Sequence, residues 1–411
     1  MGAKVVVARN KAQAASFLSV GGEGSIGSFG PPGRRAALPE PKRCDTTRAM
    51  NPSGLPSRRR FIRTAAAAAA LAPFIRTRAA DPPKIRAGQI GTGHAHAAGK
   101  METMRASAEY EVVGIVEPDP RRRENAAKNK AFAGVHWMTE EALLDLPGLQ
   151  VVAVETEVKD LLATAARCIA AGKHIHLDKP AGESLPDFRR LLDEAARRRL
   201  TVQMGYMFRY NPAFELCFQL LRDGALGDVF AVDAQMSKLI DPAGRKAMLP
   251  YRGGSMFELG CHVIDAVVTV LGRPQKVTPH NRSAGGDGFP DNQLAVLDYP
   301  GATAMVRSAV CEVDGGPRRQ FVVCGTHGTC EIRPLEPPAM RLALDAPRGE
   351  WRRGSQEVKF PKTGGRYAGD FADLAKVIRG EKTFAFTPEH DLAVQETVLL
   401  ASGLPGTIPN G

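Results

Sequence analysis

The chain has 411 residues, with 55 Lys and Arg against 44 Asp and Glu, a formal net charge of +11. The charge is uneven, because residues 1–83 hold 14 basic and 4 acidic side chains and the rest is nearly neutral. This distribution excludes a basic nucleic-acid-binding domain in residues 84–411. A composition of 43% hydrophobic and 24% charged residues is typical of globular proteins, and about 330 residues exceed what one core usually organises. Two domains are expected after residue 83.

The first 83 residues do not read as part of a core. Residues 1–49 are rich in Gly, Pro, Ser and Arg without periodicity, which predicts a disordered or spurious extension and makes Met50 the expected initiator. Residues 50–83 carry Ser57-Arg58-Arg59-Arg60-Phe61-Ile62 and then an alanine-rich apolar run, which resembles a twin-arginine export signal. That run is too short to span a bilayer. The resemblance implies the twin-arginine export machinery as a partner and a periplasmic or secreted location.

A dinucleotide-binding half is expected at residues 84–205. A buried strand over 84–90 leads into Gly91-Thr92-Gly93-His94-Ala95-His96 and a helix over 97–106. Gly91 and Gly93 permit a tight turn that brings backbone amides close to a pyrophosphate. The third glycine of the usual fingerprint is replaced by His96.

The second strand of this half, over 110–116, ends at Glu117. A carboxylate there can bind the ribose hydroxyls and repel a 2′-phosphate, which favours NAD over NADP. The neighbouring Arg121, Arg122 and Arg123 could instead accommodate such a phosphate. Further strands over 149–154, 173–177 and 201–205 alternate with helices over 158–171 and 185–199, which predicts a doubly wound parallel sheet.

Three later segments carry a resemblance to a known family. They are Asp178-Lys179-Pro180, then Gly205-Tyr206-Met207-Phe208-Arg209-Tyr210-Asn211-Pro212, then Gly253-Gly254-Ser255-Met256-Phe257-Glu258-Leu259-Gly260-Cys261-His262-Val263-Ile264-Asp265. Together with the glycine loop, they resemble the motifs of the Gfo/Idh/MocA oxidoreductases, in the same order. The resemblance covers residues 84 to 400.

The resemblance implies an α/β fold with a Rossmann domain at 84–205. The domain at 206–411 would carry an open, mostly antiparallel sheet, the substrate site and an oligomer interface. It implies Lys179 as the electrostatic catalyst, a cis bond to Pro180 and His262 as the base. The physical reading agrees, because oxidising a secondary alcohol needs a proton acceptor and a positive group near the developing alkoxide. Glu258 stands where the family usually has Asp, and the change displaces a carboxylate by about 1.5 Å, enough to alter substrate choice.

The remaining candidate residues are assigned by role. Catalysis is expected from Lys179, His262 and Glu258. Cofactor binding is expected from Gly91, Gly93, His94, Glu117, Glu155, Lys179 and Pro180. Substrate binding is expected from Tyr206, Arg209, Asn211 and Asp265. Neither His94-x-His96 nor His174-x-His176 is followed by a carboxylate or cysteine at ligand spacing, so no metal site is predicted.

The function expected is NAD-dependent hydride transfer with a hydroxyl of a sugar, sugar acid or cyclitol. One alternative is redox-assisted glycoside cleavage, in which tightly held NAD is reduced and regenerated within each turnover. A second alternative is a non-catalytic ligand-binding protein on the same fold. Retention of both Lys179 and His262 argues against the latter.

Overall fold

Five parallel strands form the first sheet of the computed structural model, which describes residues 82–361 and 364–406. Their order is β2-β1-β3-β4-β5. The strands are β1 (Ile85–Ile90), β2 (Tyr110–Val116), β3 (Val151–Val154), β4 (His174–Leu177) and β5 (Val202–Met204). Because β1 lies between β2 and β3, the chain reverses direction across the sheet there, and ligands of such folds bind outside the carboxyl ends of the strands at that point. Gly91 and Glu155 follow β1 and β3, so both lie at this edge.

Helices cover the first sheet because their apolar positions recur at helical spacing. Those connecting its strands are α1 (Ala97–Ala106), α2 (Pro120–Ala127), α3 (Glu140–Leu144), α4 (Val158–Ala170) and α5 (Leu185–Arg197), with the short turn η1 (Lys130–Phe132). In α4 the buried side chains include Leu161, Ala165 and Cys168, which form one stripe. The predicted parallel sheet with alternating helices is confirmed.

The second sheet has eight strands in the order β13-β12-β11-β10-β6-β9-β8-β7. Only β6 and β9 pair in parallel, so the predicted mostly antiparallel sheet is also confirmed. The strands are β6 (Val229–Gln235), β7 (Lys276–Arg282), β8 (Asn292–Asp298), β9 (Thr303–Ala309), β10 (Gln320–Gly325), β11 (Gly328–Ile332), β12 (Met340–Leu344) and β13 (Gly354–Val358).

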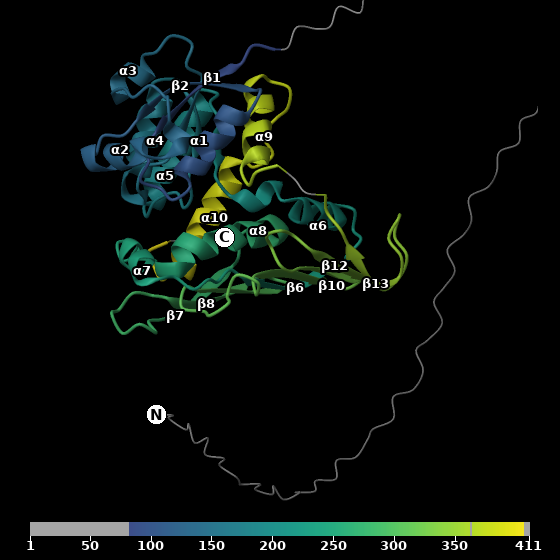
Figure 1. The fold of residues 1–411 in the computed structure, drawn as a ribbon. Helices are drawn as coiled ribbons and strands as arrows, with labels where there is room; N and C mark the ends of the chain where they lie inside the picture. Colours follow the sequence, from purple (N-terminus) through teal and green to yellow (C-terminus); the bar gives the residue numbers. More distant parts are fainter. Residues whose placement is uncertain (1–81, 362–363, 407–411) are drawn as a thin grey trace, which may run out of the picture. The chain divides into compact units, whose positions relative to one another are not determined.

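The helices of the second half lie on one face of this sheet (Figure 1). They include η2 (Met207–Tyr210), α6 (Pro212–Arg222), α7 (Pro242–Met248), the π-helical turn η3 (Met256–Gly260) and α8 (Cys261–Leu271). The chain closes with α9 (Ala368–Ile378) and α10 (Pro388–Ala401). Helix α10 packs against α8 and β7 of the second half and against α5 of the first half.

Helix α9 returns to the first half of the chain. Its Phe371 and Leu374 belong to the same buried cluster as Met101 of α1, and the Tyr110 hydroxyl donates a 2.7 Å hydrogen bond to the Phe371 carbonyl. Helix α9, from near the end of the chain, therefore packs into the core of the first half. The domain boundary predicted between residues 205 and 206 stays a prediction.

Some segments differ from expectation. The stretch 237–252, expected as a loop, contains α7, which begins at a proline and is capped by the Asp241 side chain on the Gly244 amide. The sequence also did not predict α2, α3, β7, β12 and β13, because α2 is almost wholly polar and β7 and β13 are exposed edge strands with weak alternation. The predictions for residues 1–49 and for the export signal lie outside the described residues.

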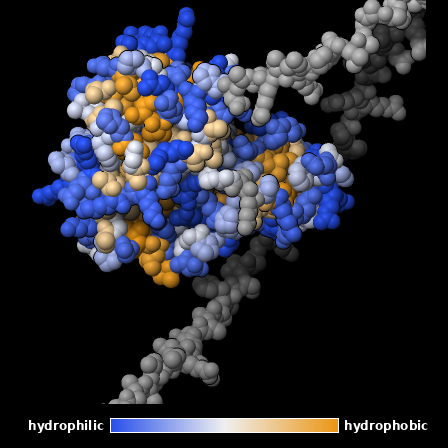
Figure 2. Space-filling model, turned by 45° about the horizontal axis from the view of Figure 1, so that its top comes forward, coloured by the Kyte–Doolittle hydropathy of each residue, from blue (hydrophilic) through white to orange (hydrophobic). Residues whose placement is uncertain are grey.

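One face of the described part is mainly polar. Figure 2 shows a face on which hydrophilic residues predominate and apolar residues gather in separate patches. No helix of residues 82–361 and 364–406 has both the length and the apolar character needed to cross a membrane.

Candidate active site

The loop after β1 has the geometry that a dinucleotide-binding turn requires. Gly91 has φ +96°, and a Cβ there would lie 2.5 Å from the Thr156 amide nitrogen, so no other residue fits. A Cβ on Gly93 would lie 3.1 Å from the Glu157 side chain. Because Gly91 and Gly93 have no side chains, a bulky ligand can approach the backbone at the start of α1. These residues fit the pyrophosphate of a nicotinamide dinucleotide.

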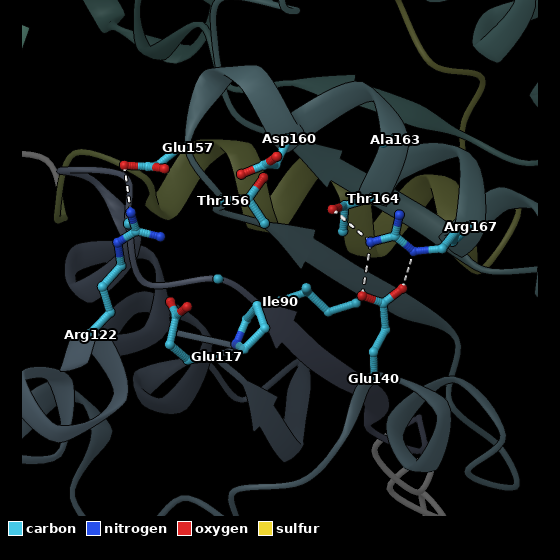
Figure 3. Close-up of a pocket in the computed structure, with 13 residues that line it drawn as sticks. Ile90, Glu117, Arg122, Glu140, Thr156, Glu157, Asp160, Ala163, Thr164 and Arg167 are labelled. Carbon is cyan, nitrogen blue, oxygen red and sulfur yellow. Dashed lines mark hydrogen bonds and ion pairs between the residues drawn. The ribbon is translucent and has the colours of Figure 1, made fainter. Parts of the chain in front are cut away.

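A cavity opens beside this loop, at the carboxyl ends of β1, β2 and β3. Figure 3 shows Glu117, Glu140, Glu157 and Asp160 around it, with Arg122 paired to Glu157 and Arg167 paired to Glu140. Both arginines are thus already bound to carboxylates. The cavity has an excess of negative charge.

Glu117 is fixed at the tip of β2. Its Oε2 accepts hydrogen bonds of 2.7 Å from the backbone amide and from the hydroxyl of Thr92, and its Oε1 accepts one of 3.0 Å from the Asp119 amide. The carboxylate therefore ties β2 to the glycine loop and lines the cavity.

Lys179 lies at the end of β4 and is joined to the second half of the chain. Its Nζ donates to the Glu258 carbonyl at 2.7 Å and lies 3.3 Å from Glu258 Oε1. Burial lowers the pKa of Lys179, but the Glu258 carboxylate and other negative groups outweigh it, so the pKa lies above its ordinary value. The expected cis bond between Lys179 and Pro180 is confirmed.

Glu258 sits in the π-helical turn η3 and is ionised. Burial raises the pKa of Glu258, but the positive charge of Lys179, followed by Lys238, overcomes this and lowers the pKa to about 2. Lys179 and Glu258 therefore form a charged pair whose lysine is 1% exposed and whose glutamate is 14% exposed.

His262 begins the next turn, in α8, with a buried side chain. Among the residues that the structure describes, its Nδ1 has no hydrogen-bond partner, and its ring lies about 6 Å from the rings of Tyr206, Phe208 and His96. Burial first, and then the charge of Lys179, hold the pKa of His262 well below its ordinary range. The imidazole is consequently neutral near pH 7 and has a free nitrogen to accept a proton.

A buried polar cluster lies beneath the glycine loop. Lys100 Nζ lies 2.8 Å from Glu155 Oε1 and 3.0 Å from Asp178 Oδ1. The Nδ1 atoms of His94 and His96 both face Asp178. Burial and then the charge of Asp178 raise the pKa of Glu155 well above its ordinary value, whereas the positive groups around Asp178 outweigh burial and lower its pKa. His94 and Glu155, predicted to bind cofactor, belong to this cluster.

Three of the four predicted substrate residues contact one another: the Arg209 guanidinium lies 5.0 Å from the centre of the Tyr206 ring and is paired with Asp265. Tyr206 borders His262, whereas the Arg209 side chain is enclosed between Asp265, at 2.6 Å, and Asp391 of α10, at 2.5 Å. Asn211 caps α6 by accepting from the Ala213 amide. Within the described ranges, no hydrogen bond of Arg209, Asn211 or Asp265 reaches Lys179, Glu258 or His262. Their binding roles stay predictions.

Two residues near the site escaped sequence reasoning. Lys100 lies on the buried face of α1 with Ala97, Met101 and Met104, so a lysine on an otherwise apolar stripe was the available signal. Tyr367, just before α9, places its ring 5.8 Å from the His96 ring. No local pattern connects Tyr367 to the site, because the tertiary return of α9 brings it there.

Comparison with protein families gives two matches. Residues 85–206 match the oxidoreductase family with an NAD-binding Rossmann fold, and residues 214–331 match the GFO/IDH/MocA C-terminal domain. Among curated proteins, the chain is 28% identical to trans-1,2-dihydrobenzene-1,2-diol dehydrogenase of Sus scrofa over 227 residues, which cover 55% of this chain and 67% of that protein.

Solved structures show the same fold. The aldose–aldose oxidoreductase of Caulobacter crescentus superposes with a TM-score of 0.64 at 20% identity, covering 78% of this chain and 98% of that chain. The UDP-N-acetylglucosamine 3-dehydrogenase of Acidithiobacillus ferrooxidans superposes with a TM-score of 0.64 at 18% identity, covering 78% and 97%. With the glycine loop, the Lys179–Glu258 pair and two matched domain models in order, the chain belongs to the Gfo/Idh/MocA family and is a nicotinamide-dependent oxidoreductase.

Proposed function

We propose that the protein is an NAD-dependent dehydrogenase that oxidises a hydroxyl group of a carbohydrate-like molecule: a sugar, a sugar acid or a cyclitol. The observation that carries the proposal is the placement of a buried, cationic Lys179 near a buried, neutral His262 with an unpartnered Nδ1. The cofactor, when bound, supplies a hydride acceptor. The protein must then supply a base and a positive charge.

The chain's residues are suited to those two tasks. His262 Nδ1 is free to accept the hydroxyl proton, and the surrounding rings of Tyr206 and Phe208 exclude water from it. Lys179 is held by Glu258 and carries the charge that stabilises the alkoxide. The names of the relatives, a diol dehydrogenase and an aldose oxidoreductase, support a hydroxylated small molecule as substrate.

The acidic cavity supports NAD over NADP. A 2′-phosphate beside Glu117 would meet Glu140, Glu157 and Asp160 as well, and Arg122 is already paired with Glu157. We expect kcat/KM with NAD to exceed that with NADP by at least about tenfold, and Glu117→Ala to narrow the ratio. A wild-type preference for NADP would contradict the assignment.

The function is tested by incubating the purified chain with NAD and a panel of aldoses, aldonic and uronic acids and cyclitols, and following NADH fluorescence. Accumulation of NADH with one of these classes, together with an equivalent amount of carbonyl product, is the expected result. Product formed from a glycoside without accumulated NADH would overturn simple dehydrogenation. Absence of turnover by a correctly folded, NAD-binding protein across the panel would overturn the substrate class.

We also propose that the protein is exported in folded form, on the support of the Arg58–Arg59 segment alone. Fractionation of cells that express the full chain should place it outside the cytoplasm. Replacing both arginines by lysine should retain it inside, whereas Arg76→Lys with Arg78→Lys should not. Equal distribution of all three chains would refute export by this route.

A further inference from the structure

We propose that His94, His96 and Asp178 form a binding site for one divalent transition-metal ion beside the catalytic residues. One ligand atom from each residue lies within 4.8 Å of the other two. His96 Nδ1 lies 3.3 Å from Asp178 Oδ2, and His94 Nδ1 contacts the same oxygen. The sequence predicted no metal here because no carboxylate follows either histidine, but the fold supplies one from the end of β4.

The two oxygens of Asp178 are used differently. Oδ1 accepts the Lys179 amide at 2.8 Å and lies 3.0 Å from Lys100 Nζ and 3.3 Å from His96 Nδ1. Oδ2 is buried, contacts His94 Nδ1, lies 3.3 Å from His96 Nδ1 and has no hydrogen bond of acceptable geometry within residues 82–361 and 364–406. A metal-binding carboxylate commonly has this arrangement, with one oxygen on the ion and the other held by hydrogen bonds from neighbours.

The His94 ring also faces that oxygen. Its Nδ1 contacts Asp178 Oδ2, while the His96 amide nitrogen lies 3.4 Å away, a longer contact than the 3.0 Å hydrogen bond on His174 Nδ1. A nitrogen and a carboxylate oxygen in contact need either a proton or a cation between them. Two imidazoles protonated on Nδ1 would donate to the carboxylate, and one divalent cation would replace both of these protons.

The two neighbouring lysines bear differently on the ion. Lys179 is paired with Glu258, whereas Lys100 lies 2.8 Å from Glu155 and 3.0 Å from Asp178 Oδ1, so Lys100 contacts Oδ1 and leaves Oδ2 to the ion. Two imidazoles and one carboxylate suit Zn²⁺, Fe²⁺ or Co²⁺ better than Mg²⁺ or Ca²⁺. Three protein ligands leave a coordination position for water or a substrate oxygen. The His96 ring, 6.2 Å from the His262 ring, places the ion next to the proposed base.

The second histidine pair, His174-x-His176, has the same spacing as His94-x-His96 but different hydrogen-bond partners. His176 Nδ1 pairs with Gln203 Oε1 at 2.8 Å, and His174 Nδ1 accepts the Thr201 amide at 3.0 Å. Both Nδ1 atoms are therefore occupied by neutral protein groups. The two pairs have the same sequence spacing and different surroundings.

The test is metal binding by the full chain after removal of any affinity tag. Protein equilibrated with Zn²⁺ and then dialysed should retain about one ion per chain by mass spectrometry, and Co²⁺ should give the visible absorption of a site with nitrogen and oxygen ligands. Mg²⁺ should not be retained. Less than about a tenth of an ion per chain, with no Co²⁺ spectrum, would overturn the proposal.

Variants locate the ion. His94→Ala and His96→Ala should each weaken Zn²⁺ binding at least about tenfold, while the exposed His280→Ala should leave it unchanged. If either variant does not fold, the wild-type Co²⁺ spectrum still decides whether the site exists. Binding that survives both folded variants, or that disappears in His280→Ala, assigns the ion elsewhere and refutes the triad.

Discussion

At the scale of single residues, Glu258 is the feature that separates this chain from the family pattern it resembles. The longer side chain reaches Lys179 with its Oε1, while the Glu258 carbonyl accepts a second contact from the same ammonium group. The glutamate, one methylene longer than aspartate, therefore keeps its carboxylate in the site. It is the main partner that keeps Lys179 charged despite burial.

Shortening or neutralising this side chain should impair turnover. Glu258→Asp withdraws the carboxylate by about 1.5 Å, and we expect kcat to fall about 10- to 100-fold. Glu258→Gln removes the charge that raises the pKa of Lys179 and should lower kcat at least as much. The exposed Glu381→Gln serves as control. Steady-state kinetics measure the effect, and wild-type kcat in both Glu258 variants would show that the pair has no role in turnover.

The buried state of His262 determines how kcat/KM should depend on pH. Burial and the charge of Lys179 hold the pKa of His262 well below 6.5, so the imidazole stays unprotonated as the pH falls through that value. We therefore expect kcat/KM to remain level between about pH 8 and 6, and to decline only at lower pH. A decline centred near pH 6.5 that disappears in His262→Asn would contradict the buried, neutral state.

At the scale of elements, the turn η3 determines where Glu258 and His262 point, and helix α9 affects stability. The sequence from Ser255 to Leu271 is typical of one continuous helix, in which Glu258 and His262, four residues apart, would share a face. The structure instead begins that run with a π-helical turn, which directs Glu258 to Lys179 while His262 meets aromatic rings. Such turns are frequent at functional sites. Periodicity does not reveal this one because nearly every residue from Met256 to Val268 is buried, so the run has no separate apolar face.

Helix α9 carries a destabilising carboxyl group. Asp370 is fully buried, and burial raises its pKa to about 8. Its two carboxyl oxygens lack hydrogen-bond partners within residues 82–361 and 364–406. Because the folded-state pKa lies above the unfolded one, the folded protein loses stability as the pH rises from about 4 towards 8.

Replacing this group should stabilise the protein. We expect Asp370→Asn to raise the free energy of unfolding at pH 7.5 by about 1–3 kcal/mol, with little effect near pH 4. The exposed Asp193→Asn should change neither value. Denaturant unfolding at both pH values measures this. A loss of stability at pH 7.5 would show that the carboxylate is ionised and paired.

At the scale of the whole molecule, buried apolar runs and glycine turns are local signals, and they predicted the first sheet and its helices over 97–106, 158–171 and 185–199. The mostly antiparallel second sheet was expected from the family resemblance. The sequence placed β2 over Tyr110–Val116 and α1 over Ala97–Ala106 with the bounds observed. What it could not predict depends on distant contacts: Lys100 beneath the glycine loop, Asp178 facing two histidines, and Tyr367 arriving with α9. Polar groups brought together by tertiary folding leave no periodic trace in the chain.

The same limit applies to the predicted substrate residues. Arg209 and Asp265 belong to motifs that resemble those of the family, yet here they bind each other and Asp391 inside the protein. The motif order led to the family, while the side-chain environment indicates which residues remain free to meet a substrate. Tyr206 is the predicted substrate residue whose ring lies 6.2 Å from the ring of His262.

The central claim is that Lys179 supplies the charge on which oxidation of the substrate hydroxyl depends. The most direct measurement is a single-turnover rate of NADH formation by Lys179→Ala, with the substrate found for the wild-type protein. The exposed Lys128→Ala is the matched control. We predict a loss of at least about 10³-fold for Lys179→Ala, with NAD still bound and the fold intact, and wild-type rates for the control. A Lys179→Ala protein that forms NADH at the wild-type rate would contradict the claim.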